Sequence, residues 1–310
     1  MNFSVIICAH TEDRWQDLIE AVDSVTQQTI PPHQIVLAID HNPALLSRAQ
    51  TQFPTATVVE NGQERGLNGT RNSGVAVTTG EVVAFLDDDA IAAPDWLEQL
   101  LAAYTAEQIV GAGGKINPLW LNGRPAWFPE EFYWVVGCSY RGLPEETAPV
   151  RNLIGCNMSY RREVIEQLGG FRNGIGHIGG RPQGDDETEF CIRLRQAMPQ
   201  ATLLYRPQAQ VAHKVPAGRA NWTYYRWRCY LEGRSKALLS RLVGANDGLS
   251  TERTYTLKVL PSGVWRGLRD SVRQRSWAGT GRAAAITAGL FITTIGYGLG
   301  RLLLIGQRVE

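Results

Sequence analysis

The residues that most clearly suggest chemistry are three consecutive aspartates, Asp87 to Asp89, which directly follow the apolar run 82–86. Like charges at this spacing repel one another, and removing them from water carries a large free-energy cost. A divalent cation would neutralise the cluster, and oxygen ligands without sulfur are typical of Mg²⁺ or Mn²⁺ sites. A solvated turn or a helix cap would need only one aspartate. The cluster therefore favours a metal site, and a metal there would in turn hold a diphosphate.

A second acidic group lies in the segment GDDETEF, residues 184–190. Asp186, Glu187 and Glu189 stand at the start of a predicted helix, where the helix dipole stabilises negative charge. One of these carboxylates, placed in a cleft, could instead take the proton from an attacking hydroxyl as a general base. The residues alone leave both interpretations open.

Two single residues extend the candidate site. His213 lies in VAHKV, between strand-like flanks, and imidazole can join a carboxylate as a ligand for Mn²⁺. A lone histidine is more often an ordinary core or surface residue, so this signal is weak by itself. Arg71 stands beside a glycine-rich turn, where a guanidinium could bind a diphosphate.

The elements that must position these residues alternate along the first part of the chain. Apolar, β-branched runs predict strands, and apolar residues at helical spacing predict the helices between them. Strands are expected at 3–9, 34–40, 56–61 and 81–87, with helices at 14–28 and 44–53 and a third helix after Gly69. This alternation predicts a parallel, doubly wound sheet with ligands at the carboxyl ends of the strands, where Asp40 and Asp87 fall.

The remainder of the chain has a different texture. Residues 111–160 are irregular and aromatic, short helices are expected at 159–171 and 185–197, and a final strand at 211–215. We therefore expect three regions with boundaries at 1–110, 111–245 and 246–310.

Composition restricts the class of protein. A net charge of +1 gives no reason to expect a nucleic-acid partner, and 44% apolar residues argue against disorder. Five scattered cysteines without a CxxC pair fit a reducing compartment rather than a disulfide framework or a zinc site. No signal peptide is visible, because residues 2–4 lead straight into a strand-like run, so the catalytic part is expected in the cytosol.

The C-terminal region suggests a membrane. Residues 283–300 contain no charged side chain, and a spanning helix needs about 20 apolar residues. Five arginines precede this run and suit an anionic cytoplasmic leaflet: Arg266, Arg269, Arg273, Arg275 and Arg282. We expect association with the cytoplasmic side of the membrane, either peripheral or through a single C-terminal anchor. A hairpin of core helices is the alternative.

Taken together, these motifs resemble the family 2 glycosyltransferases with the GT-A fold. The resemblance covers about residues 3–215, with the motifs in the family's order. They are Cys8 to Glu12 for the family's P-T-Y-N pattern, SVTQQ (24–28), Asp40, GxxxxRNxG (66–74), FLDDDAxxxPDWL (85–97), GGF (169–171) and the acidic helix 186–193. The fold that the resemblance implies is α/β, a Rossmann-like and mostly parallel central sheet flanked by helices, with a C-terminal helical extension. The three regions would then be a nucleotide-sugar-binding half (1–110), an acceptor-binding and catalytic half (111–245), and a helical, membrane-associating region (246–310).

The resemblance also implies roles for residues. Ala9, Glu12 and Asp40 would surround the nucleobase, while Arg71, Asp87 and Asp88 would face the rest of the nucleotide. Asp89, Asp87 and His213 would bind Mn²⁺ or Mg²⁺. Glu187 would be the base, with Asp186 the alternative because the family's Glu-Asp order is reversed here. Cys8 replaces the family's proline, a change that would affect only the backbone turn.

The implied reaction is transfer of a sugar from a nucleotide-diphosphate donor to a hydroxyl of a glycan or lipid-linked acceptor, with inversion. The segment 124–159 resembles a branch that assembles prokaryotic surface glycans and lipid-linked sugars. Candidate acceptor residues are Trp127, Phe128, Phe132, Trp134 and Asn157, although the aromatic ones could equally be core or membrane-interface residues. A homo-oligomer is left open.

Two alternatives compete with this interpretation. A nucleotidyltransferase with a GT-A-like fold should have a glycine-rich loop after the first strand, and CAHTEDR (8–14) contains no glycine. A non-catalytic sugar-binding protein on the same fold would not need carboxylates at 87, 89 and 187.

Overall fold

The computed structural model describes residues 1–174, 184, 186–244 and 254–304. The chain forms two compact units. The first holds residues 1–117 and 186–213 with the segment that begins at residue 144. The second holds residues 118–143 and the chain from residue 214 on. The three regions expected from the sequence have other boundaries and stay a prediction, because they follow motifs and not the compactness of these units.

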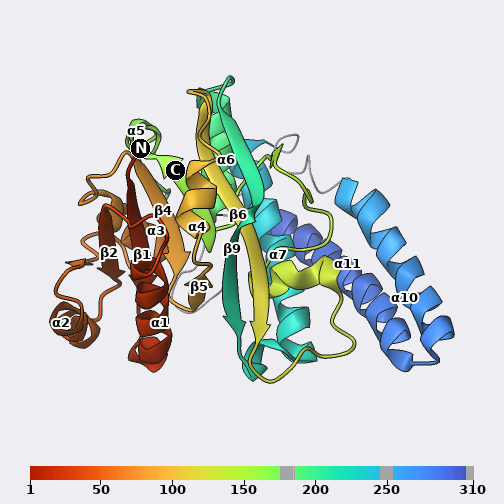
Figure 1. Cartoon of the computed structure of the whole chain (residues 1–310). Helices are drawn as coiled ribbons and strands as arrows, with labels where there is room; N and C mark the ends of the chain where they lie inside the picture. Colours follow the sequence, from red (N-terminus) through yellow and green to blue (C-terminus); the bar gives the residue numbers. More distant parts are fainter. Residues whose placement is uncertain (175–183, 185, 245–253, 305–310) are drawn as a thin grey trace. The chain divides into compact units, whose positions relative to one another are not determined.

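The first unit begins with the expected alternation of strands and helices (Figure 1). Its strands are β1 (Phe3–Ala9), β2 (Gln34–Ile39), β3 (Thr57–Glu60) and β4 (Val82–Asp87). Its helices are α1 (Trp15–Thr26), α2 (Pro43–Gln52) and α3 (Leu67–Val75), with the short 3₁₀ turn η1 (Glu12–Arg14) before α1. The strands lie in the order β3-β2-β1-β4 and are parallel, which confirms the prediction for this half of the sheet.

The other half of the sheet is antiparallel, so the sheet is mixed. It continues from β4 through β8 (Asn157–Arg161), β6 (Ile109–Trp120), β9 (Thr202–Val215) and β5 (Ala90–Ala92), and β7 (Ala148–Pro149) pairs with β9. The helices of this part are α4 (Trp96–Leu101), α5 (Arg162–Gln167) and α6 (Asp186–Ala197). Antiparallel pairing of β5 with β9 places His213 opposite Ala90, one residue after Asp89.

Strand β6 lies in the segment that the sequence predicted to be irregular. Its glycines and proline are poor strand formers. The structure explains two of these glycines by close backbone approach: a Cβ on Gly113 would lie 2.6 Å from the carbonyl oxygen of Asn157, and one on Gly114 would lie 1.8 Å from that of Ala209. The glycines therefore serve the packing of β6 between β8 and β9, information that a local pattern does not contain.

The core of the first unit lies between the sheet and its helices. Ile6, Val36, Val83 and Phe85 are buried from the strands, and Phe190 of α6 packs among them with Phe171. The rings of Phe171 and Phe190 have centroids 4.6 Å apart. This packing fixes α6 against the sheet, and with it the carboxylates at its N-terminus.

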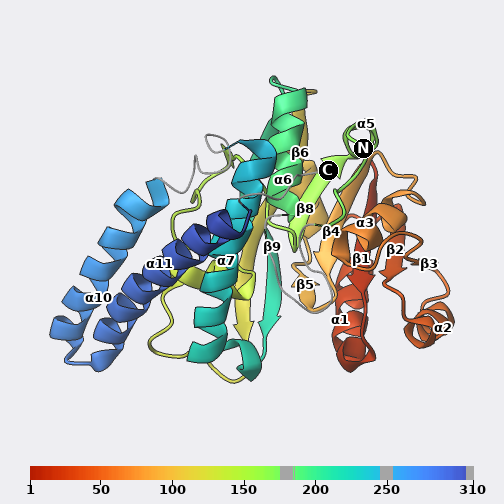
Figure 2. The ribbon, with the colours of Figure 1, turned by 180° about the vertical axis from the view of Figure 1, so that it is seen from behind.

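The second unit is mainly helical in its described residues. Its elements are η2 (Glu130–Val136), η3 (Ala217–Arg219), α7 (Trp222–Val243), the π-helical turn η4 (Tyr255–Val259), α10 (Leu260–Gln274) and α11 (Trp277–Leu304). Helices α10 and α11 form an antiparallel hairpin, and α11 runs alongside α7 (Figures 1 and 2). Among the described residues, one helix is both long enough and apolar enough to cross a membrane, and it covers Trp277–Leu303.

Glycines bring these helices into close contact. A Cβ on Gly267 of α10 would lie 2.7 Å from the carbonyl oxygen of Gly279. One on Gly296 would lie 2.3 Å from the carbonyl oxygen of Tyr230 in α7, and one on Gly233 of α7 would lie 2.1 Å from that of Thr293. A glycine-lined α11 is thus packed on α7, as the hairpin alternative expected.

Candidate active site

The site lies in the first unit, at the carboxyl ends of β1, β2 and β4. Ala9 ends β1, and its carbonyl oxygen accepts a hydrogen bond from the backbone N–H of Asp40 at 2.8 Å. Glu12 lies in η1 and is half exposed, with its carboxylate 3.8 Å from Arg48. The residues expected around the nucleobase thus follow adjacent strand ends.

Asp40 organises the loop that follows β3. Its carboxylate accepts hydrogen bonds from Asn61 Nδ2 and His41 Nδ1, both at 2.8 Å, and from the backbone N–H of Gly66 at 3.1 Å. Burial alone would raise the pKa of Asp40, but these bonds outweigh it and lower the pKa below its ordinary value. Asp40 is therefore ionised near neutral pH, and its carboxylate holds the glycine-rich turn before α3 in place.

The three aspartates at the end of β4 have different environments. Asp88 and Asp89 are buried, and Asp87 is partly exposed. Arg14 Nη1 lies 2.8 Å from Asp88 Oδ1 and 3.2 Å from Asp89 Oδ2. Sequence reasoning did not select Arg14, which comes two residues after the Cys8 to Glu12 motif at the end of η1.

One arginine does not neutralise the cluster. Burial raises the pKa of Asp88 to about 7 despite Arg14, and burial together with Asp89 raises the pKa of Asp87. Asp88 Oδ2 is buried, and no hydrogen bond to it is found in the part of the chain that the structure describes. A shortage of positive charge and a buried carboxylate oxygen without a hydrogen bond are both typical of residues that bind a cation.

Asp87 and His213, two of the three predicted metal ligands, lie close together. The ligand atoms of Asp87, His213 and Cys156 all lie within 4.8 Å of one another. Atoms that bind one Mg²⁺ ion lie up to ~4.2 Å apart, so small side-chain movements would complete a site. Carboxylate and imidazole suit Mn²⁺, whereas the Cys156 thiol is a softer ligand that the oxygen-based prediction did not include.

Asp89 lies next to this group rather than in it. His213 Nε2 and Asp89 Oδ1 are 3.1 Å apart, so the carboxylate of Asp89 orients the imidazole in this structure. To bind a metal, Asp89 would have to exchange its contacts with His213 and Arg14.

The carboxylates of α6 meet Arg71 of α3. Arg71 and Asp186 are both buried and form an ion pair through Arg71 Nη1 and Asp186 Oδ2. Arg71, expected at the diphosphate, thus anchors the start of α6. Glu187 is partly exposed, and burial, followed by the neighbouring Asp186, raises the pKa of Glu187 well above its ordinary value.

Residues 155 and 156 connect the two acidic groups. A Cβ on Gly155 would lie 2.7 Å from Arg71 Nη2 and 3.9 Å from Glu187 Cδ. The next residue, Cys156, lies beside Asp87 and His213. The candidate metal ligands and the candidate base therefore flank one dipeptide, and a side chain at its first position would crowd the Arg71 guanidinium.

The candidate acceptor residues are mostly structural. Asn157 is fully buried, donates to the carbonyls of Lys115 and Ala209, and accepts from Trp96 Nε1 at 2.8 Å, so its amide is used inside the sheet. Within the second unit Phe128 and Phe132 are buried and pack on Tyr225. Trp127 stacks on Phe128, and Trp134 Nε1 donates to Tyr255 Oη at 3.0 Å. These contacts match the core interpretation, since neither Phe128 nor Asn157 presents a free surface.

Comparisons with known proteins agree with this arrangement. The family model described as Glycosyl transferase family 2 matches residues 4–169. A glucosyl-dolichyl phosphate glucuronosyltransferase of Haloferax volcanii is 33% identical over 315 residues, covering 100% of this chain and 99% of the relative. The succinoglycan biosynthesis protein ExoM of Rhizobium meliloti is 25% identical over 249 residues, covering 77% of this chain and 75% of that protein.

Solved structures show the same fold. A mannosyltransferase of Pyrobaculum calidifontis in complex with GDP-Man and Mn²⁺ has a TM-score of 0.56 at 19% identity, covering 98% of this chain and 81% of that one. GalNAc-T7 with UDP, GalNAc and Mn²⁺ has a TM-score of 0.54 at 20% identity, covering 76% of this chain and 51% of that one.

The mixed sheet, with aspartates at the end of β4, defines a protein of the GT-A class. The chain belongs to glycosyltransferase family 2, and it is a glycosyltransferase. Family membership decides against the nucleotidyltransferase and the non-catalytic sugar-binding protein as alternatives.

Proposed function

We propose that the protein transfers a sugar from a nucleotide-diphosphate donor to a hydroxyl of a lipid-linked sugar, with inversion and with the help of a divalent metal. The observation that carries the chemistry is the dipeptide 155–156, which lies near Arg71 and Glu187 at its first residue and near Asp87 and His213 at its second. The full-length similarity to an enzyme named for a glucosyl-dolichyl phosphate acceptor supports the acceptor class.

Asp87, His213 and, after rearrangement, Asp89 would hold Mn²⁺ or Mg²⁺, with Cys156 next to them. The ion, when bound, supplies a Lewis acid for the leaving diphosphate. Ala9, Glu12 and Asp40 would contact the nucleobase side of the donor, and Asp88 would lie towards the ribose. Arg71 supports the site through Asp186 and through its positive charge beside Asp87.

Glu187 is the proposed base. Its raised pKa suits proton transfer, because a base with a higher pKa holds a proton more firmly once it accepts one. The acceptor oxygen forms a bond to the anomeric carbon while its proton passes to Glu187. The bond from that carbon to the diphosphate breaks, and its electron pair leaves with the diphosphate. A single displacement of this kind inverts the anomeric configuration.

We also propose that the enzyme works at the cytoplasmic face of the membrane, where a lipid-linked acceptor and a nucleotide-sugar can meet. The apolar helix α11 and the acceptor named for the Haloferax relative support this location. Analytical ultracentrifugation would measure whether the enzyme forms a homo-oligomer.

The deciding experiment is a transfer assay with a panel of nucleotide-activated sugars, including a glucuronate, and a glucosyl phosphate lipid in detergent. We expect one donor to be used, with Mn²⁺ or Mg²⁺ required and EDTA abolishing turnover. NMR of the product should show an inverted anomeric configuration. Undiminished transfer in EDTA, or retention of configuration, would contradict the mechanism.

A further inference from the structure

Helix α10 is amphipathic, but its apolar face points away from the protein. Trp265 is 68% exposed, Leu268 43% and Val272 80%, and Leu257 in the preceding turn is 77% exposed. These residues recur at helical spacing and form one outward stripe. In a water-soluble protein, a helix normally turns such a stripe towards the core. An apolar stripe that faces outward is therefore typical of a surface that binds a membrane or a partner.

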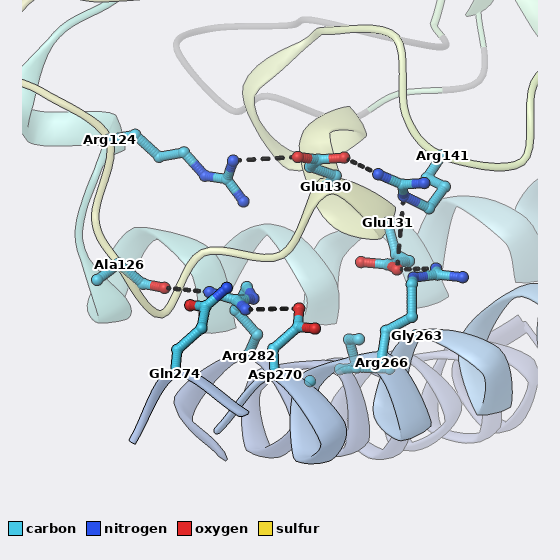
Figure 3. Close-up of a pocket in the computed structure, with 12 residues that line it drawn as sticks. Arg124, Ala126, Glu130, Glu131, Arg141, Gly263, Arg266, Asp270, Gln274 and Arg282 are labelled. Atoms are coloured by element: carbon cyan, nitrogen blue, oxygen red, sulfur yellow. Dashed lines mark hydrogen bonds and ion pairs between the residues drawn. The ribbon is translucent and has the colours of Figure 1, made fainter. Parts of the chain in front are cut away.

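The inward face of α10 is polar and small. Gly263 and Gly267 are buried, and a Cβ on Gly263 would lie 2.6 Å from Glu131 Oε1. Arg266 forms an ion pair with the buried Glu131, and Asp270 accepts from Arg282 of α11 at 3.2 Å. Figure 3 shows these pairs around a cavity of about 420 Å³, lined also by Arg124, Glu130 and Arg141.

The ion pairs fix the rotation of α10. Turning the apolar stripe inward would leave Glu131 buried without Arg266 and would place bulky side chains where only glycine fits. The outward orientation of Trp265, Leu268 and Val272 is therefore determined by the contacts of the opposite face.

Helix α11 is long enough to span a bilayer, but its packing argues against that. Gly296 and Gly300 lie against Tyr230 and Arg234 of α7. Helix α7 carries charged residues along this stretch, among them Glu232 and Lys236, which form an ion pair. If α11 crossed the hydrocarbon core, it would carry these charges with it, at a high cost. The hairpin is therefore suited to lie in the plane of a surface.

We propose that the α10–α11 hairpin docks this enzyme in the plane of an anionic lipid bilayer, with the stripe of Leu257, Trp265, Leu268 and Val272 inserted between headgroups. This deepens the membrane location proposed above, and assigns insertion to α10, which sequence analysis had treated only as an arginine-rich flank. On α11 a second apolar row is exposed: Phe291, Ile295, Leu299 and Leu302.

Charge favours a lipid surface over a second copy of the chain. Arg269 and Arg273 are exposed and directly follow Leu268 and Val272, so they lie along one edge of the stripe, and Arg275 ends the helix. Arginines beside an apolar helix face attract anionic headgroups. A two-fold contact through the same stripe would bring the arginine row of one copy to that of the other.

The test is flotation of the full-length protein with vesicles of phosphatidylcholine, with and without phosphatidylglycerol. We expect strong binding to the anionic vesicles and a loss of about tenfold or more in partitioning for Leu268→Glu/Val272→Glu. Leu121→Glu, at an exposed leucine after β6, is the matched control and should bind as the wild type does. Arg269→Gln/Arg273→Gln should lose the preference for anionic lipid.

Vesicle binding needs no turnover, so its failure is distinct from failure of the proposed sugar transfer, which is assayed in detergent. Absence of wild-type binding, or unchanged binding of Leu268→Glu/Val272→Glu, would overturn the inference. Sedimentation of the same proteins tests the alternative that a second copy of the chain binds the stripe. A dimer that dissociates in the double variant, with vesicle binding intact, would assign the stripe to self-association.

Discussion

Two neighbouring carboxylates at the start of α6 have different partners. Asp186 is buried and forms an ion pair with Arg71. Burial, followed by the neighbouring Asp186, raises the pKa of Glu187. Pairs of titratable groups whose environments differ in this way commonly divide a structural role from a proton-transfer role. On this basis Glu187, and not Asp186, is the proposed base.

Replacement of Glu187 by glutamine should separate catalysis from stability. Glu187→Gln keeps the size of the side chain but cannot accept a proton, so kcat should fall by about 10² to 10⁴ while donor affinity and thermal stability stay near wild type. In the wild type at saturating Mn²⁺, kcat/KM should rise with pH through the raised pKa of Glu187, because only the ionised carboxylate accepts a proton. This rise of kcat/KM with pH should be absent from the residual activity of Glu187→Gln.

The matched variant is Asp186→Asn. It removes the ion-pair partner of the buried Arg71 guanidinium, and breaking such a pair destabilises a protein by about 3–5 kcal/mol. Thermal unfolding should therefore show a large loss for Asp186→Asn and almost none for Glu187→Gln. The opposite pattern, with activity lost in a stable Asp186→Asn protein, would reassign the base.

Asp89 is the residue through which the metal proposal is tested most directly. Asp89→Ala removes a candidate ligand and the partner of both His213 and Arg14, so Mn²⁺-dependent binding of UDP or GDP should weaken by at least about tenfold. Calorimetry with and without EDTA measures this effect. Glu60→Ala, at an exposed carboxylate that ends β3, is the control. Nucleotide binding that ignores both EDTA and Asp89→Ala would exclude a metal-dependent donor site.

The sequence predicted part of this residue-scale arrangement. Asp87 and His213 were selected as partners although 126 positions separate them along the chain, and the structure brings their ligand atoms within 4.8 Å. Arg14 and Cys156 were not selected, because a single arginine after a turn and a single cysteine carry no distinguishing spacing. Their roles depend on which strand ends meet, which only the three-dimensional fold determines.

At the scale of elements, glycines that look alike in the sequence of α11 have unlike surroundings. A Cβ on Gly296 would meet the carbonyl oxygen of Tyr230 at 2.3 Å, whereas one on Gly298 would meet nothing within 4 Å. Alanine is favoured over glycine in a helix by about 1 kcal/mol when the site has room. Replacement by alanine should therefore have opposite effects on stability at these two positions, which are separated by a single residue.

We expect Gly298→Ala to raise the free energy of unfolding by up to about 1 kcal/mol and Gly296→Ala to lower it by about 1–3 kcal/mol. Denaturant melts of the two variants in parallel measure the difference. Equal shifts of the same sign would mean that α11 does not pack closely on α7.

The elements themselves were predictable to different degrees. Strands β1 to β4 and the helices between them follow from hydrophobic periodicity, because each is short, regular and bounded by turn residues. Strand β6 was missed because Gly111, Gly113 and Gly114 weaken its local signal, although they are required by close neighbours such as Tyr160 and Ala209. The antiparallel half of the sheet depends on such contacts between distant segments, and no local pattern encodes them.

For the whole molecule, the proposed donor site and the proposed docking surface belong to different units. The residues proposed to face the nucleotide lie in the first unit, and the α10–α11 hairpin lies in the second. Leu268→Glu/Val272→Glu should therefore bind the donor nucleotide with wild-type affinity. Its KM for an acceptor embedded in vesicles should rise by about tenfold or more, since the acceptor is confined to the surface that the variant no longer holds.

A short-chain, water-soluble acceptor provides the comparison for this variant. With that substrate the double variant and Leu121→Glu should have the kcat/KM of the wild type, because chemistry in the first unit is untouched. A loss that is equal for both acceptors would show that the substitutions disturb the catalytic unit.

Sequence alone could not resolve how the C-terminal region meets the membrane. Residues 283–300 are uncharged in either case, and the arginines before them suit both a spanning anchor and a surface helix. The distinction depends on Glu131, Asp270 and the glycines of α7 and α11, which set the rotation of α10 and the partner of α11.

Arg14 has a consequence for how the enzyme matures. Because its guanidinium lies against Asp88 and Asp89, the chain itself supplies part of the positive charge that these buried carboxylates need. If the site binds a metal as proposed, the ion would share or take over this role of Arg14, whose side chain is 29% exposed. Loading would then be an exchange of counterions on a folded protein.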